Sequence, residues 1–233
     1  GSVLEDADQR GLAHFMEHMS FNGSRHFPKN ELVDYLQKVG VKFGADLNAY
    51  TSFDETVYIL PIPLTDTANF RKGLTVLQDW AGGLSFEDEQ INGERGVVLE
   101  ESRLGKGADD RMFRKTFPIQ YEGSLYAQRL PIGKDSILKT FPYDAVKRFY
   151  RTWYRPDLMA VIIVGDIDVN KTEQLVKEYF SSLKNPSSET KRTYATVTSR
   201  TKDESIVVTD AEATNFFVEV DYPFYQIKPD ITI

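Results

Sequence analysis

A twelve-residue segment near the start of the chain, from Gly11 to Asn22, constrains the fold more than any other. Its apolar residues recur at helical spacing, which predicts an amphipathic helix; they are Leu12, Phe15, Met16 and Met19. Gly23 follows at the position where glycine commonly ends a helix. The segment also holds two of the three histidines of the chain, His14 and His18. Residues four apart share one face of a helix, so both imidazoles can reach one ion.

Glu17 lies between the two histidines and, three residues after His14, points to the same side of the helix. The pattern His-x-x-Glu-His is the inverse of the commoner zinc-protease signature. A catalytic zinc site typically has three protein ligands and one open position for water. The segment therefore predicts a metal site that lacks its third protein ligand.

The third ligand has few possible sources. The 233 residues include no cysteine, so it must be His26, an aspartate or a glutamate. His26 follows the predicted helix in a loop beside a proline, where an ordinary surface histidine is favoured. A helix predicted at 85–104 offers Glu94 and Glu101, which share a face because they are seven residues apart. Such a pair can supply one ligand and one carboxylate that orients a histidine.

The rest of the chain is divided into short helices and strands by glycine and proline. Helical patterns occur at 30–39, 66–84, 85–104, 143–153 and 171–183. Strand patterns occur within 48–60, at 157–164 (as a buried strand), and at 205–209 and 215–221. Residues 105–135 are predicted to be long loops with helical turns, and 184–193 have the composition of a linker. The aromatic residues around Phe149–Tyr154 are expected in the core.

Composition excludes several classes of protein. The net charge is −7, the pI is near 5.1 and no cluster of Lys and Arg stands out, which argues against a nucleic-acid-binding domain. The longest clear apolar run, Met159–Val164, is too short to cross a bilayer, so no transmembrane segment is expected. The absence of cysteine excludes a disulfide scaffold, a thiol nucleophile and a thiolate metal site.

The run from Gly11 to Ser24, GLAHFMEHMSFNGS, closely resembles the zinc-binding segment of the pitrilysin family of metalloendopeptidases. That family includes insulin-degrading enzyme and the mitochondrial processing peptidase. Three further segments are similar to it: FPKNE from Phe27, NAYT with DETVY from Asn48, and YRPDLM with a later Gly-Asp from Tyr154. The resemblance implies an α+β fold of the mitochondrial-processing-peptidase type. In that αβ roll a largely antiparallel sheet carries helices on one face.

The resemblance also implies a zinc cofactor and assigns roles to particular residues. His14 and His18 become ligands, and the third ligand, about 76 positions beyond the second histidine, falls on Glu94. Glu17 becomes the general base. Glu101 becomes the carboxylate that supports a ligand histidine. The strand to which family substrates add as an extra strand corresponds to Asn48, Ala49, Tyr50 and Thr51.

Family enzymes consist of paired halves that together enclose the substrate. The resemblance implies an N-terminal zinc-binding domain at 1–190 with a shortened first strand, and then a linker and the truncated start of a second αβ domain at 191–233. A missing C-terminal half or a partner subunit is therefore expected, and the isolated chain should be weakly active or inactive. The expected substrate is a peptide or an unfolded polypeptide, and the expected compartment is periplasmic or secreted.

Two other interpretations compete with a metalloendopeptidase. The first is a non-catalytic peptide-binding or scaffolding subunit with the same fold. Glu17 argues against it, because a scaffold needs no general base. The second is a structural zinc site, which is disfavoured because such sites usually have four ligands and are commonly rich in cysteine.

Overall fold

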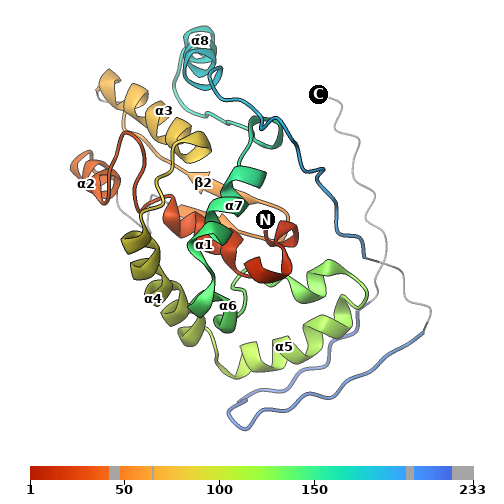
Figure 1. Cartoon of the computed structure of the whole chain (residues 1–233). Helices are drawn as coiled ribbons and strands as arrows, with labels where there is room; N and C mark the ends of the chain where they lie inside the picture. The colour runs from red at the N-terminus through yellow and green to blue at the C-terminus, as the bar shows by residue number, and fades with distance from the viewer. Residues whose placement is uncertain (42–47, 65, 198–201, 222–233) are drawn as a thin grey trace.

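A computed structural model describes residues 1–41, 48–64, 66–197 and 202–221 (Figure 1). The α-helices are α1 (Leu12–Met19), α2 (Glu31–Lys38), α3 (Thr67–Gly82), α4 (Asp88–Leu104), α5 (Ala108–Gln120), α6 (Asp135–Thr140), α7 (Tyr143–Trp153) and α8 (Val169–Phe180). The two strands are β1 (Asn48–Thr51) and β2 (Thr56–Ile59). Short 3-10 turns lie at Ser2–Leu4, Ala7–Gln9, Leu125–Gln128 and Pro156–Leu158.

The short helix α1 lies at the centre of the molecule, packed against α4, α7 and β1 (Figure 1). Its apolar residues have no exposed surface, as the helical spacing predicts. They form the main core together with side chains of α4, α6 and α7. The predicted aromatic contribution is confirmed, since Phe149 and Tyr150 are buried and Trp153 and Tyr154 pack against this core. A central helix of this kind holds its polar side chains in fixed positions.

The strands β1 and β2 form an antiparallel hairpin in which Asn48 is paired with Ile59 and Thr51 with Thr56. It is the only sheet that the described residues form. A second core fills the space between the hairpin, α2 and α3, and the buried Trp80 is part of it. The expected α+β class is correct. Within the described residues, however, the antiparallel sheet consists of two strands, fewer than the sequence predicted.

Three helices differ from the sequence prediction. The long helix begins at Asp88 rather than after Ser85, whose backbone N–H instead donates to the carbonyl of Gly23. Within the region predicted as loops, α5 is a full helix of 13 residues that accommodates Pro118 in its last turn. A proline there removes only one backbone donor, so the turn survives. The third, α6, begins at Asp135, where the region predicted as loops ends, and continues to Thr140 through residues for which the sequence predicted no element.

The strands predicted at 157–164, 205–209 and 215–221 are absent from the described structure. The apolar run after Met159 was expected to be buried, yet Ile162 is 83% and Val164 is 91% exposed. Phe216 is likewise 98% exposed. The first segment begins within the 3-10 turn Pro156–Leu158, and no described segment hydrogen-bonds beside any of the three to form a ladder. A strand needs such a neighbour to satisfy its backbone groups, and an apolar run alone does not provide one.

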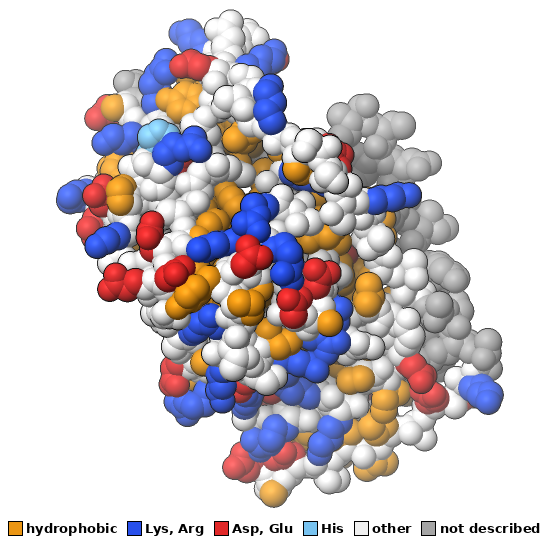
Figure 2. All heavy atoms as spheres, viewed as in Figure 1, with side chains coloured by type: hydrophobic (Ala, Val, Ile, Leu, Met, Phe, Trp, Pro, Cys, Tyr) orange, Lys and Arg blue, Asp and Glu red, His pale blue; other side chains and the backbone are white. Residues whose placement is uncertain are grey.

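Acidic and basic side chains are interspersed on the face seen in Figure 2, without a large area of one sign. This matches the absence of a basic cluster in the sequence. Among the described helices, none has an apolar stretch long enough to span a bilayer.

Candidate metal centre

Polar contacts hold both ends of α1. At its N-terminus, the backbone N–H groups of Gly11 and Ala13 donate to Oε1 of the buried Glu5, over 3.0 and 2.8 Å. Gly11 has φ = 103°, a left-handed conformation that glycine adopts without strain. At the other end, the indole N–H of Trp80 donates to the carbonyl of Ser20 over 2.8 Å. Glu5 therefore satisfies backbone donors that a helix start leaves unpaired.

His14 and His18 approach each other on one side of α1, as their spacing predicts. Their Nε2 atoms are 3.2 Å apart and their rings are nearly perpendicular, at 86°. The carboxylate of Glu101, on α4, lies 3.6 Å from Nε2 of His14 and 3.4 Å from Nε2 of His18. Ligands about 2.0–2.1 Å from a tetrahedral zinc are separated from each other by roughly 3.3 Å. One ligand atom from each of the three side chains lies within 4.8 Å of the others, so the three converge closely enough to share one metal ion.

Glu94 occupies a different place, beside the other ring nitrogen of His18. Its Oε1 lies 2.7 Å from Nδ1 of His18, and its Oε2 accepts a hydrogen bond of 2.7 Å from Nδ2 of Asn22. The family resemblance implies Glu94 as a ligand and Glu101 as the carboxylate that supports a histidine. In the structure Glu101 faces the two Nε2 atoms and Glu94 does not, because Nδ1 and Nε2 point out of different edges of the ring.

The charges around the histidines explain how their pKa values move. Burial lowers the pKa of His14, and the neighbouring His18 lowers it further. Burial would also lower the pKa of His18, but the hydrogen bond and charge of Glu94 outweigh it and raise that pKa. Burial opposes ionisation of Glu94, yet hydrogen bonds from His18 and Asn22 keep its pKa below the usual value. An ionised Glu94 accepts a hydrogen bond from Nδ1–H of a neutral His18, which leaves the Nε2 lone pair for a metal.

Glu17 lies on α1 next to His18 and is buried. The hydroxyl of Thr51, at the end of β1, donates to Oε2 of Glu17 over 2.6 Å. Burial raises the pKa of Glu17, and the Thr51 hydrogen bond works against that rise. Of the predicted edge strand, Asn48 and Tyr50 are exposed, whereas Ala49 and Thr51 are half-buried. Strand β1 packs against α1, and Thr51 brings it into contact with Glu17.

His26 is not part of this group. Its Nδ1 lies 2.8 Å from Oδ1 of the buried Asp79 on α3, and its backbone N–H donates to the other carboxylate oxygen. About half of the His26 side chain is exposed, which agrees with the surface histidine that the sequence indicated. The same carboxylate accepts a hydrogen bond from Ser24, and the contacts fix the loop after α1.

Sequence reasoning missed Asn22 and Glu5. Asn22 is the last residue of the segment from Gly11 to Asn22, but nothing in the pattern indicates that its amide holds Glu94. Glu5 precedes α1 by several residues, outside the usual position of a helix cap. Neither residue could be found from periodicity, because both act through contacts that depend on how the chain turns.

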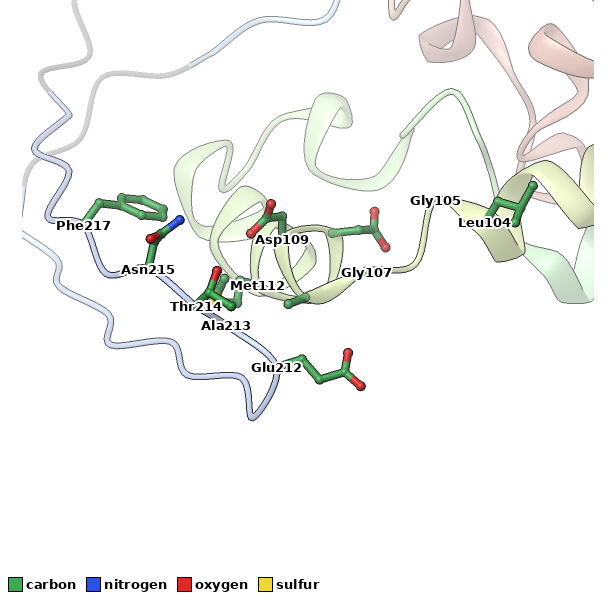
Figure 3. Close-up of a pocket in the computed structure, with 12 residues that line it drawn as sticks. Leu104, Gly105, Gly107, Asp109, Met112, Glu212, Ala213, Thr214, Asn215 and Phe217 are labelled. Carbon is green, nitrogen blue, oxygen red and sulfur yellow. The ribbon is translucent and has the colours of Figure 1, made fainter.

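A cavity of about 580 Å³ lies away from these residues, between the start of α5 and the segment 212–217 (Figure 3). Asp109, Asp110 and Glu212 contribute carboxylates to its lining, and Phe217 contributes a ring. Arg111 joins the two sides, because its guanidinium donates to Asp210 and to Glu212 over 2.7 Å. The cavity contains none of the site residues predicted from the sequence.

Comparisons with known proteins identify relatives of this chain. The family described as insulinase (peptidase family M16) matches residues 1–114, and the peptidase M16 inactive domain matches residues 140–230. The chain is 42% identical to the probable zinc protease PqqL of Haemophilus influenzae over 82% of its length. It is 36% identical to the probable zinc protease PqqL of Escherichia coli over 78% of its length. It spans 20% of each of these relatives.

The fold is similar to that of a solved structure. The first half of the periplasmic protease PqqL from Escherichia coli superposes with a TM-score of 0.80 at 34% identity. The match covers 86% of this chain and 42% of that one. This similarity confirms the fold class that the sequence resemblance implied.

Proposed function

Because the chain belongs to the insulinase family of peptidases, family M16, we propose that it carries the zinc site of a metalloendopeptidase. The observation that carries the proposal is the convergence of three side chains from two helices, His14, His18 and Glu101. Two imidazoles and one carboxylate are a donor set that zinc accepts in catalytic sites. Three protein ligands leave one coordination position open for water.

Each glutamate then has its own role. Glu101 supplies the third ligand, because its oxygens face the Nε2 atoms that would bind the metal. Glu94 orients His18, because it holds the Nδ1 proton and fixes the ring and its tautomer. This assignment exchanges the two roles that counting along the sequence had given to the glutamates.

Glu17 is the proposed general base. Zinc, when bound, would polarise the scissile carbonyl and lower the pKa of a water molecule. Glu17 takes one proton of that water while the oxygen of the water bonds to the carbonyl carbon. When the C–N bond breaks, Glu17 returns the proton to the leaving amine, so the carboxylate is regenerated. Its raised pKa suits both halves of this transfer.

The proposed substrate is a peptide or an unfolded polypeptide that extends along β1. Only the β2 side of β1 is paired among the described residues, so its other edge has backbone groups to offer. An added strand is recognised by main-chain hydrogen bonds. The backbone of Asn48, Ala49, Tyr50 and Thr51 is the proposed edge.

The rest of the substrate chamber comes, in this proposal, from protein outside this chain, since the chain spans a fifth of its curated relatives. The division of the chain near residue 190 into two domains stays a prediction. A periplasmic or secreted location is also proposed, because a related structure is that of a periplasmic protease.

The competing candidate is a scaffolding subunit that keeps the fold and the metal. The environment of Glu17 favours an enzyme. Its carboxylate is buried beside the proposed ligand His18 and makes no salt bridge within the described structure. A scaffold would gain nothing from placing an ionisable group there, because burying it costs free energy.

The test compares the full-length protein with its Glu17→Gln variant on a fluorogenic peptide and an unfolded protein. The wild type should cleave them and should lose this activity on removal of zinc with a chelator. Glu17→Gln should retain zinc and lose about 10²- to 10⁴-fold in kcat, because the amide cannot take the proton. Equal rates for the two proteins would favour the scaffold.

A further inference from the structure

Glu17 has one hydrogen-bond partner among the described residues, and that partner is a threonine on the neighbouring strand. The Thr51 hydroxyl donates to Oε2 over 2.6 Å, a short distance that is typical of a bond to a charged acceptor. No described residue donates to Oε1. One oxygen is therefore held and the other is free to accept a proton.

The place of Thr51 follows from the register of the hairpin. Side chains alternate along β1, so Ala49 and Thr51 are the half-buried pair and their neighbours are exposed. Thr51 lies opposite Thr56, and their hydroxyls are 3.2 Å apart. The single proton of Thr51 goes to Glu17, so Thr51 accepts from Thr56. Among the described residues Thr56 itself makes no hydrogen bond to Glu17, so Thr51 alone holds Oε2.

We propose that the Thr51 hydroxyl is a positioning group that fixes the carboxylate of Glu17 for proton transfer. The inference rests on the proposed function, since it concerns the same site. Thr51 reaches the reaction only through Glu17, by holding Oε2 and turning Oε1 toward the site. Its backbone belongs to the proposed substrate edge, so the strand that receives the peptide also orients the base. A one-residue slip in β1 would turn Thr51 outward and leave Glu17 unheld.

The test uses the full-length protein with Thr51→Val, which keeps the shape of the side chain and removes the hydroxyl. Thr51→Ser restores a hydroxyl at the same position. Thr56→Val is the matched control, because it removes a hydroxyl from the same cross-strand pair without removing a hydrogen bond to Glu17. Zinc content, melting temperature, kcat and KM are measured for each, and the crystal structure of Thr51→Val shows the Glu17 rotamer.

For Thr51→Val we expect unchanged zinc content and KM and a loss of about 10- to 100-fold in kcat, as for a lost hydrogen bond to a charged group. Glu17 should rotate away in the crystal structure, Thr51→Ser should recover most of the rate, and Thr56→Val should stay close to the wild type. An unmoved Glu17 with wild-type kcat would overturn the inference. Loss of zinc or of the fold in Thr51→Val would also overturn it, by showing a structural role.

The two failures can be told apart. If the wild type cleaves no peptide while Glu17 still rotates in Thr51→Val, the proposed function fails and the positioning contact survives. If the wild type is active and Thr51→Val is equally active, only the inference fails.

Discussion

Oε1 of Glu94 lies 2.7 Å from Nδ1 of His18. The ligand role suggested by its sequence position would place Glu94 beside Nε2, the other nitrogen of the ring. The other nitrogen of the ring faces His14 and Glu101. A histidine that gives Nδ1–H to a carboxylate is fixed in the tautomer with a lone pair on Nε2. The contact between Glu94 and His18 therefore determines which of the two glutamates, Glu94 or Glu101, is placed to bind a metal beside Nε2.

The first prediction separates the two glutamates by zinc affinity. Glu94→Gln should weaken zinc binding by about 10- to 100-fold, as expected when the group that orients a ligand is changed. Glu101→Gln should weaken it further, because a ligand carboxylate is lost. Competition with a chromophoric chelator measures both constants. The reverse ranking would restore Glu94 as the third ligand.

The second prediction concerns Asn22, whose amide donates to both Glu94 and the carbonyl of His18. Asn22→Ala should weaken zinc binding less than Glu94→Gln does, because the carboxylate remains but is held less firmly. Asn22→Asp should weaken it more than Asn22→Ala, since a second negative charge would lie beside Glu94. The same chelator competition tests this order. Wild-type affinity in Asn22→Asp would show that Asn22 does not hold Glu94.

Sequence periodicity predicted the helix faces of the candidate metal centre better than it predicted the sheet. The helix with His14, Glu17 and His18 follows from spacing alone, since residues three or four apart must share a face. The face common to Glu94 and Glu101 follows in the same way. Which of the two reaches Nε2 does not, because it depends on the packing of α4 against α1 and on the orientation of one ring.

The failures have a physical cause too. The apolar run after Met159 has strand composition, but a strand depends on an adjacent strand with which it can pair. The sequence of one segment does not indicate which other segment will pair with it. The helix α5 was missed because Pro118 is a strong break signal in the interior of a helix, whereas it is tolerated near this helix end. The periodic segment 143–153, by contrast, was predicted to the residue.

The third prediction concerns Gly93 and Gly96, which lie in the interior of α4 and are exposed. A Cβ added at either position would meet no atom within 4 Å. Alanine at each should therefore raise the free energy of unfolding by about 0.5–1 kcal/mol, because glycine has more backbone entropy to lose in a helix. Chemical denaturation of the single and double variants measures this. Destabilisation would indicate that protein outside this chain packs against that face of α4.

The last prediction concerns Glu5, whose buried carboxyl caps the start of α1. Burial raises its pKa to about 8, against the opposing effect of hydrogen bonds from Ala13 and Gly11. Between the ordinary glutamate pKa of 4.5 and about 8, the folded state therefore binds more protons at this site than the unfolded state. The contribution of Glu5 to stability is complete at low pH and falls as the pH rises through this range.

Glu5→Gln cannot ionise, so it removes this dependence. The free energy of unfolding of Glu5→Gln relative to the wild type should increase steadily from pH 5 to pH 8, by roughly a few kcal/mol in total. Taking the difference between the two proteins cancels any constant cost of the amide and the titration of other groups. Asp8→Asn is a suitable control, since Asp8 is exposed and pairs with Arg148 at the surface. A difference that stays constant with pH would contradict this prediction. It would show that the Glu5 carboxyl titrates alike in the folded and unfolded states and is therefore in contact with solvent in the folded protein.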